Sequence, residues 1–404
     1  MSLSRTSSFP AQFWLLFSGM LISAIGASMI WPFLMIYISE RLDSPLTVNA
    51  SLISLNSVAG LISSLIAGPI IDRLGRKRVM VVSLLTNALG FVLLSRAQSL
   101  AAFALLMVLQ GASNPLYRVG ADAMIADLIP ENQRIDAYSR MRLSNNLGVA
   151  IGPALGGFLA SVSYTIAFYG AAGGLFLYGF LVAIGAKETL PKLLPSLRHS
   201  ENPADKGWGG YQTVLKDRRF LRFTLILVLP QISAAILWVL LGVYTKTHFG
   251  ISEKLYGWIP VTNASMVVLF QLAVTAVSRR YPPLSALAVG SLLYGLGVGS
   301  VALGQGFGWF WMSMVIVTVG EMILVPTSST YVANLAPPDR RGRYMSLYSL
   351  TWIVASGIGP LAGGFLNDAF GALAMWIGGG VAGVLAAVAF LWEWKAKPAA
   401  GSLS

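Results

Sequence analysis

The sequence contains no cysteine and little charge. Without cysteine the chain has no disulfide, no thiol nucleophile and no cysteine-based metal site. The two histidines, His199 and His248, lie outside the apolar stretches, which argues against a histidine metal site or a catalytic triad. Only 11% of the 404 residues are charged, 55% are hydrophobic, and the mean hydropathy is +0.70. This composition excludes an ordinary soluble globular domain.

Long apolar stretches recur along nearly the whole chain. The hydrocarbon core of a bilayer is about 30 Å thick and needs roughly 20 apolar residues per helix. We therefore predict an all-α integral membrane protein with twelve transmembrane helices. They are expected at about 12–37, 46–70, 79–97, 99–128, 136–161, 164–187, 219–247, 255–278, 284–303, 309–335, 343–367 and 369–393. The first is too long for the apolar part of a signal peptide, so we expect it to be retained.

The formal net charge is +12, and its distribution carries information. With twelve spans, 23 of the 28 Lys and Arg residues fall on one side of the membrane and four on the other, with Arg118 inside a helix. The positive-inside rule makes the basic side cytoplasmic, which places both termini in the cytoplasm. We expect the basic surface to face anionic membrane lipids rather than nucleic acid.

The chain carries an internal duplication. Segment 128–159 aligns with 335–366 at twelve identical positions of 32. Between the halves, 188–218 mixes prolines, glycines and charges, which predicts a cytoplasmic linker between bundles at 1–187 and 219–404. Two pseudo-symmetric six-helix bundles are typical of transporters that work by alternating access, with the substrate site near the bilayer midplane. The alternative is that duplication merely doubles a stable bundle.

A charged motif follows the second apolar stretch and reads Gly68-Pro-Ile-Ile-Asp72-Arg73-Leu-Gly75-Arg76-Lys-Arg. Gly75 permits a tight turn, and Asp72 with the basic residues offers charge-assisted hydrogen bonds at the membrane face. The spacing resembles the G-x-x-x-D-R-x-G-R-K/R signature of the major facilitator superfamily, which implies the major facilitator fold. Alternatively, the basic residues serve only to fix the topology.

That resemblance implies a conformational latch. Asp72 and Arg76 would join Asp127, at the cytoplasmic end of the fourth helix, and the start of the eleventh helix to hold the outward-facing state. The full expected set is Gly68, Asp72, Arg73, Gly75, Arg76, Asp127 and Arg142. The matching segment of the second half, 277–281, keeps basic residues but lacks the Asp and Gly, so only the first copy is expected to form the network.

The expected fifth and eleventh helices share a glycine-proline pattern. Small residues at four-residue spacing allow close helix packing, and an internal proline bends a helix. The predicted hinge residues are Gly148, Gly152, Pro153, Gly156 and Gly157, with Gly359, Pro360 and Gly363 in the second half. The pattern resembles the G-x-x-x-G-P-x-x-G-G motif of drug:proton antiporters in the superfamily. Packing alone is the alternative explanation.

Polar residues recur every four positions in the expected fourth helix: Gln110, Asn114, Arg118 and Asp122. Residues so spaced lie along one face of a helix. Charges at this depth normally face a cavity and have partners, so we predict that Asp122 pairs with Arg118 or with Arg142. Arg118 and Asp122 are candidates for proton coupling, and a static ion pair is the alternative.

Glu321 is the sharpest candidate for proton coupling. It lies near the middle of the tenth expected helix, which contains no basic residue. A carboxylate removed from water takes up a proton more readily and can release it to the other side or to an arriving cation. The surrounding pattern, G-E-x-x-x-x-P, resembles the tenth helix of multidrug antiporters of the superfamily, in which the matching glutamate is a proton and drug site. A neutral, hydrogen-bonded structural acid is the alternative.

One position departs from the family pattern. Many members carry an Arg where this chain has Met107, and an acid in the first helix, whose core here has no ionisable residue. Arg118, two turns later, is expected to replace that Arg. The predicted cavity walls are Trp31, Asn114, Tyr117, Gln231, Trp238, Asn263 and Gln271. Aromatic residues among them could instead face lipid.

The resemblance implies a secondary transporter of the multidrug efflux type, which exports small amphipathic or cationic compounds against protons. The alternatives are a proton-coupled metabolite exporter, a lipid flippase, or, more remotely, a receptor or membrane enzyme. No cofactor, metal or nucleic acid is expected, with the proton as coupling ion, and no enzymatic activity. We expect a monomer in a bacterial plasma membrane, in contact with lipids and a small-molecule substrate.

Overall fold

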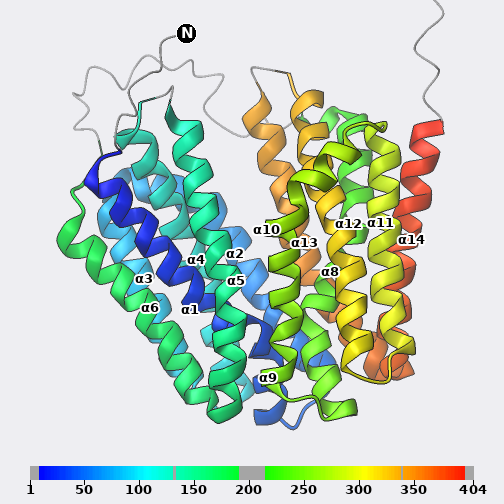
Figure 1. Cartoon of the computed structure of the whole chain (residues 1–404). Helices are drawn as coiled ribbons and strands as arrows, with labels where there is room; N and C mark the ends of the chain where they lie inside the picture. The colour runs from blue at the N-terminus through cyan, green and yellow to red at the C-terminus, as the bar shows by residue number, and fades with distance from the viewer. Residues whose placement is uncertain (1–8, 131–132, 191–213, 338–339, 396–404) are drawn as a thin grey trace, which may run out of the picture. The chain divides into compact units, whose positions relative to one another are not determined.

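The computed structural model describes residues 9–130, 133–190, 214–337 and 340–395 (Figure 1). Within these ranges the ordered elements are helices and turns. The first half contains α1 (Ala11–Arg41), α2 (Leu46–Leu74), α3 (Arg76–Leu94), α4 (Leu100–Leu128), α5 (Arg134–Val162) and α6 (Tyr164–Gly185). The second half contains α8 (Arg218–Phe249), α9 (Glu253–Tyr256), α10 (Trp258–Ser278), α11 (Pro283–Ser300), η4 (Val301–Leu303), α12 (Phe307–Leu335), α13 (Arg341–Phe370) and α14 (Ala372–Lys395).

The helices confirm the prediction of an all-α membrane protein, since each expected span coincides with a helix. The eighth span is divided at Gly257 into α9 and α10. In the described part of the chain, 11 helical segments are long and apolar enough to cross a membrane, with α9 and α10 taken together. Helix α5 is not among them, because its first turns are charged and Asn145 and Asn146 follow. Most of the expected linker, at 191–213, lies outside the described residues.

Local chemistry explains where several helices begin and end. Ser99 caps α4 by accepting a hydrogen bond from the Ala102 amide, and Asp217 caps α8. Gly75 and Gly371 have φ angles of 93° and 91° at the turns into α3 and α14, and Gly250 ends α8 with a φ of 63°. Only glycine adopts such angles without strain, so these residues make short interhelical turns possible.

The described residues form two compact units. One comprises residues from 1–34 and 58–192, and the other residues from 35–57 and 193–404. The second unit therefore includes the end of α1 and the start of α2. There, Ser54 Oγ donates to the Gly357 carbonyl of α13, and Asp368 accepts from the backbone amides of Leu46 and Thr47. The expected bundles at 1–187 and 219–404 stay a prediction.

In the first unit, the glycines of α5 lie directly against the backbone of α1. A Cβ atom on Gly152 would lie 1.9 Å from Ser28 Oγ, and one on Gly156 would lie 2.1 Å from the Met29 carbonyl oxygen. Ser28 also donates to the Gly148 carbonyl at 3.0 Å. We call this close packing of the α5 glycines on α1 a seam. Glycine is required there because no side chain fits between the two helices.

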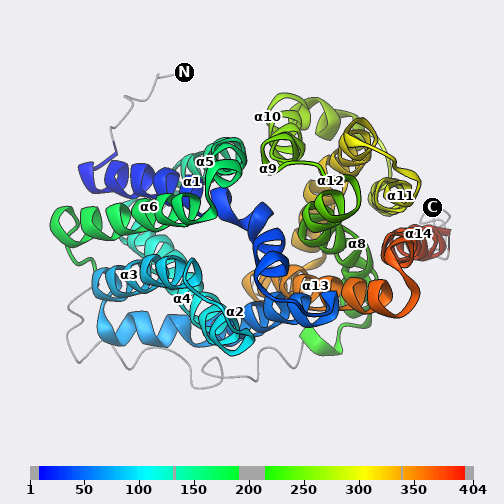
Figure 2. The same ribbon diagram turned by 90° about the horizontal axis from the view of Figure 1, so that it is seen from below.

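The second unit repeats this seam between α13 and α8. A Cβ atom on Gly359 would lie 2.9 Å from Ala235 Cβ, and one on Gly363 would lie 2.7 Å from Leu240 Cδ1. Helix α8 also packs on α14, and α11 packs on both α14 and α12, as Figure 2 shows within this unit. The glycine-proline pattern is thus a packing seam in both halves, and its hinge role remains a prediction.

Candidate functional site

The turn between α2 and α3 holds the charged motif of the first unit. Arg76 Nε lies 3.0 Å from Asp127 Oδ2, at the end of α4, and Arg76 Nη2 lies 3.9 Å from Asp72 Oδ1. The Arg76 side chain is only 11% exposed, whereas Asp72 is 67% exposed. The structure therefore brings together three of the residues expected in the latch, with Asp127 as the closer acid.

A fourth charged residue completes this turn and was missed by the sequence analysis. The Glu188 carboxylate, beyond the end of α6, accepts hydrogen bonds from the backbone amides of Arg76 and Lys77, each at 3.1 Å. Those amides are the free donors at the first turn of α3, where a negative charge is favourable. A Cβ atom on Gly75 would lie 2.6 Å from Glu188 Oε2, so a larger residue there would displace the carboxylate. The acid after the sixth apolar stretch was the only signal for this contact.

The other residues expected in the latch make no side-chain ion pair or hydrogen bond with Arg76 or its two acids in the described part of the chain. The structure places Arg73 and Arg142 in exposed positions without an ion pair to a described residue, and Gly68 has open space around its Cα. Arg76 Nη1 is buried and has no hydrogen-bond partner among the described residues. The conformational latch therefore stays a prediction.

The polar residues of α4 have separate partners. Gln110 donates to the Asn87 carbonyl of α3 at 3.3 Å, and Arg118 Nη2 lies 3.4 Å from Asn145 Oδ1 of α5. Tyr117 packs edge-on against Tyr178, with ring centroids 6.4 Å apart. Gln110 thus joins α3 to α4, and Asn145 is a partner that the sequence analysis missed.

Asp122 does not make the expected ion pair. Among the described residues no basic group lies within 4.0 Å of its carboxylate, so neither Arg118 nor Arg142 pairs with it. The Tyr138 hydroxyl instead donates to the Asp122 backbone carbonyl at 3.0 Å. The pairing prediction is therefore corrected, because Arg118 turns toward α5.

Glu321 lies in the middle of α12 beside an uncharged partner. Its Oε2 accepts a hydrogen bond of 2.8 Å from Asn263 Nδ2 of α10, and the same nitrogen lies 3.0 Å from Thr318 Oγ1. In the described part of the second unit, no Lys, Arg or His lies within ion-pair distance of this carboxylate. The carboxylate is thus held by an amide that donates to it, without a fixed positive charge.

The backbone of α12 around Pro326 is supported by a side chain of α10. Pro326 has no amide proton, so the Met322 carbonyl four residues earlier loses its intrahelical partner. Gln271 Nε2 donates to that carbonyl at 2.9 Å and also to Thr275 Oγ1 at 2.9 Å. Gln271 was expected in the cavity wall. Its amide nitrogen completes the backbone hydrogen bonding of α12, and its place in a cavity wall stays a prediction.

The expected cavity-wall residues fall into three sets. Asn263 contacts Glu321, and Gln271 contacts the Met322 carbonyl of the same helix. Gln231 and Trp238 lie on α8, where Gln231 is buried and its Oε1 has no partner among the described residues. Trp31, Asn114 and Tyr117 belong to the first unit. Among the described residues, only the first set makes side-chain hydrogen bonds to α12, Asn263 to the Glu321 carboxylate and Gln271 to the Met322 carbonyl.

Comparison with known proteins agrees with this architecture. The family model described as Major Facilitator Superfamily matches residues 16–233 and 223–404. The chain is 27% identical over 366 residues to a Na(+), Li(+), K(+)/H(+) antiporter of Planococcus maritimus, covering 83% of this chain and 84% of that one. It is 24% identical over 393 residues to the multidrug resistance protein MdtH of Yersinia pestis, covering 96% and 95%.

Solved structures share the fold at low sequence identity. A POT family transporter in complex with a thioalcohol-conjugated peptide matches with a TM-score of 0.78 and 18% identity, covering 96% of both chains. The nucleoside transporter NupG matches with a TM-score of 0.76 and 13% identity, covering 96% of this chain and 100% of that one. The family match spans nearly the whole chain, and the helices follow the same fold. The chain is a multi-pass membrane protein that belongs to the major facilitator superfamily of transporters.

Proposed function

We propose that the chain is a secondary transporter that exports small amphipathic or cationic compounds in exchange for protons. The observation that carries this proposal is the Glu321 carboxylate in the middle of α12, with an Asn263 amide as donor and no basic partner among the described residues. An acid buried in a membrane helix is costly and normally serves a pathway.

Glu321 is suited to bind a proton and a substrate cation in alternation. In its charged form it accepts a hydrogen bond from the Asn263 amide, and it can attract a substrate cation in a weakly screened environment. In its protonated form the same oxygen pair carries no charge, and the attraction to a cation is lost. Proton binding and cation binding at one carboxylate are therefore mutually exclusive, which is the requirement for exchange.

Two relatives support different parts of this proposal, one the exchange for protons and the other the export of drugs. One is named as a cation/H(+) antiporter and one as a multidrug resistance protein, both over most of their length. Other relatives, in Bacillus subtilis, are MFS-type transporters whose names assign no substrate. Inorganic cations are accordingly a second candidate load, and export of a metabolite or flipping of a lipid is a third.

The remaining features of the proposal follow from the sequence. The uneven distribution of basic residues favours cytoplasmic termini, and we place the protein in a bacterial plasma membrane. In our proposal it acts as a monomer surrounded by lipids, needs no cofactor besides the proton, and moves its substrate without converting it. Arg118 and Asp122 of α4 are proposed as further groups in proton coupling, and the two duplicated halves as the moving parts of alternating access.

The test is proton-coupled transport in proteoliposomes with a pH-sensitive dye inside. Ethidium, Na⁺, K⁺ and a neutral sugar are added to vesicles carrying a proton gradient, for wild type and Glu321→Gln. We expect ethidium or a cation to dissipate the gradient in wild type and not in Glu321→Gln, which cannot release a proton. Glu393→Gln is the matched control, because Glu393 lies near the end of α14 and forms an ion pair with Arg222 at 3.1 Å, away from the partners of Glu321.

The alternatives predict different results. Unchanged proton flux and pH dependence in Glu321→Gln would remove Glu321 from the mechanism. Scrambling of fluorescent lipid without proton movement would favour the flippase. Proton flux with the sugar alone would favour a metabolite exporter.

A further inference from the structure

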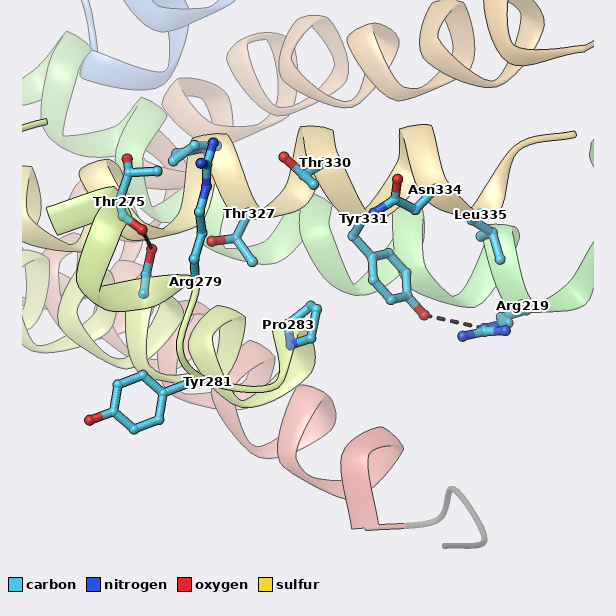
Figure 3. Close-up of a pocket in the computed structure, with 12 residues that line it drawn as sticks. Arg219, Thr275, Arg279, Tyr281, Pro283, Thr327, Thr330, Tyr331, Asn334 and Leu335 are labelled. Carbon is cyan, nitrogen blue, oxygen red and sulfur yellow. Dashed lines mark hydrogen bonds between the residues drawn. The ribbon is translucent and has the colours of Figure 1, made fainter. Parts of the chain in front are cut away.

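The second unit contains a pocket of about 570 Å³ away from the Glu321 carboxylate. It lies where α8 begins and α10 and α12 end (Figure 3). Two arginines line it, Arg219 of α8 and Arg279 just after α10, and its lining contains no acidic residue. The pocket therefore carries a positive charge that its own walls do not neutralise.

The neighbouring acid does not cancel this charge. Asp217 Oδ1 accepts the backbone amides of Arg219 and Phe220 as the cap of α8, and its Oδ2 accepts from the Tyr344 hydroxyl at 2.8 Å. Arg219 Nε donates to the Tyr331 hydroxyl at 3.3 Å, which is a neutral group. The Arg279 guanidinium makes no ion pair or hydrogen bond with a described residue. Both guanidinium groups are thus free of a carboxylate within the described chain.

Neutral hydrogen-bonding groups lie between the two arginines. Thr327, Thr330 and Tyr331 follow one another along α12, with Arg279 beside Thr327 at one end and Arg219 beside Tyr331 at the other (Figure 3). Threonine and tyrosine hydroxyls can donate to an anion, and arginine presents the planar fork that suits phosphate oxygens. The volume lies in the range of small-ligand pockets and exceeds what a single phosphate fills.

We propose that this pocket binds a phosphate-bearing ligand, supplied either by the headgroup of an anionic phospholipid or by a soluble organic phosphate. The arginines at the two ends hold the negative oxygens, and the α12 hydroxyls hydrogen-bond the part between them. This site is distinct from Glu321 and does not depend on what the protein transports.

The test measures binding to the whole purified protein in detergent. The probes are sodium pyrophosphate, against sodium chloride at the same ionic strength, and dihexanoyl-phosphatidylglycerol, against dihexanoyl-phosphatidylcholine. Each is titrated while the midpoint of thermal unfolding is followed for wild type, Arg219→Gln/Arg279→Gln and Arg218→Gln/Arg280→Gln. The last variant is the matched control, because it removes the same charge from exposed neighbours that do not line the pocket.

We expect at least one anionic probe to stabilise wild type and the control alike, and to bind the pocket variant at least about tenfold more weakly, since two charge-assisted contacts are lost. Stabilisation by phosphatidylglycerol alone identifies a lipid as the source, and stabilisation by pyrophosphate identifies a soluble phosphate. If neither probe acts, or if the control variant loses binding as much as the pocket variant, the proposal is wrong.

Single lysine substitutions keep the test valid if the double variant does not fold. Arg219→Lys and Arg279→Lys retain the charge but lose the fork geometry, so each should weaken binding less than the double glutamine variant. Thr275 is left unchanged in every variant, because it accepts a hydrogen bond from Gln271, which also donates to the Met322 carbonyl of α12. Equal affinity in both lysine variants and wild type would argue against direct contact by the arginines.

Discussion

The acids of the charged turn in the first unit and the Glu321 carboxylate of the second unit differ in their partners: the former lie beside an arginine, the latter beside an uncharged amide. Arg76 lies between Asp127 and Asp72, and Glu188 accepts the backbone amides beside it. Glu321 has an amide as its partner. A carboxylate beside a fixed positive charge stays ionised, whereas one held by a neutral donor can gain or lose a proton at a smaller cost. The first arrangement suits a structural fastening and the second suits proton exchange.

The largest effect is expected from giving Glu321 the kind of partner that Asp127 has. Asn263→Lys would replace the amide that donates at 2.8 Å with an ammonium group within reach of the carboxylate, and the ion pair would hold Glu321 in its charged form. We expect proton-coupled transport in proteoliposomes to fall to background at all pH values between about 6 and 8. Binding of cationic substrate should be lost as well, because the two positive charges compete for one carboxylate.

Asn263→Gln serves as the control, since it keeps an amide donor without adding charge. Its coupling should be weakened but should still depend on pH. Comparable pH-dependent coupling in Asn263→Lys and wild type would mean that the neutral surroundings of Glu321 are not what permits exchange.

A second prediction concerns the seams that the two halves share. Alanine at Gly156 would bring its Cβ 2.1 Å from a backbone oxygen of α1, whereas alanine at Gly363 would meet the Leu240 Cδ1 atom at 2.7 Å, which can rotate away. Overpacking costs about 1–3 kcal/mol, and replacing a helical glycine returns up to about 1 kcal/mol. We expect Gly156→Ala to lower the free energy of unfolding by about 2 kcal/mol and Gly363→Ala to leave it nearly unchanged.

The midpoint of thermal unfolding in detergent checks this difference. Gly148→Ala and Gly359→Ala extend the comparison along each seam. Equal losses in the two units would show that the α13–α8 seam is as rigid as the α5–α1 seam. The duplication would then have preserved the packing more closely than the distances indicate.

The fold could be predicted from the sequence because its signals are long and repeated. Each apolar stretch was sufficient to predict a helix, and Gly75 marked a turn that needs a positive φ angle. Helix α5 is less apolar than the other long helices, because charged residues occupy its first turns and Asn145 and Asn146 follow them. One of these amides, Asn145, accepts a hydrogen bond from Arg118. A polar helix within a membrane bundle can be recognised from its neighbours rather than from its own composition.

The candidate site was only partly predictable. Glu321 and Asn263 were both proposed, but the hydrogen bond between them joins residues 58 positions apart. The contacts of Glu188 with α3 and of Gln271 with the Met322 carbonyl depend on backbone groups, which every residue carries, so no side-chain pattern reveals them. The ion pair expected for Asp122 failed because helical spacing fixes the face of a side chain but not its rotamer.

The smallest expected effect separates the two acids beside Arg76. Asp127→Asn would remove the acid 3.0 Å from a guanidinium that is 11% exposed, leaving it poorly paired at a cost of about 1–3 kcal/mol. Asp72→Asn would remove a partner 3.9 Å away that is 67% exposed, and such a surface pair contributes at most about 1 kcal/mol. Unfolding midpoints of the two variants in detergent should therefore fall in that order. The reverse order would mean that Asp72, rather than Asp127, anchors Arg76. If neither midpoint changes, the charged turn contributes little to the stability of the first unit, and its purpose would have to be sought in the transport cycle.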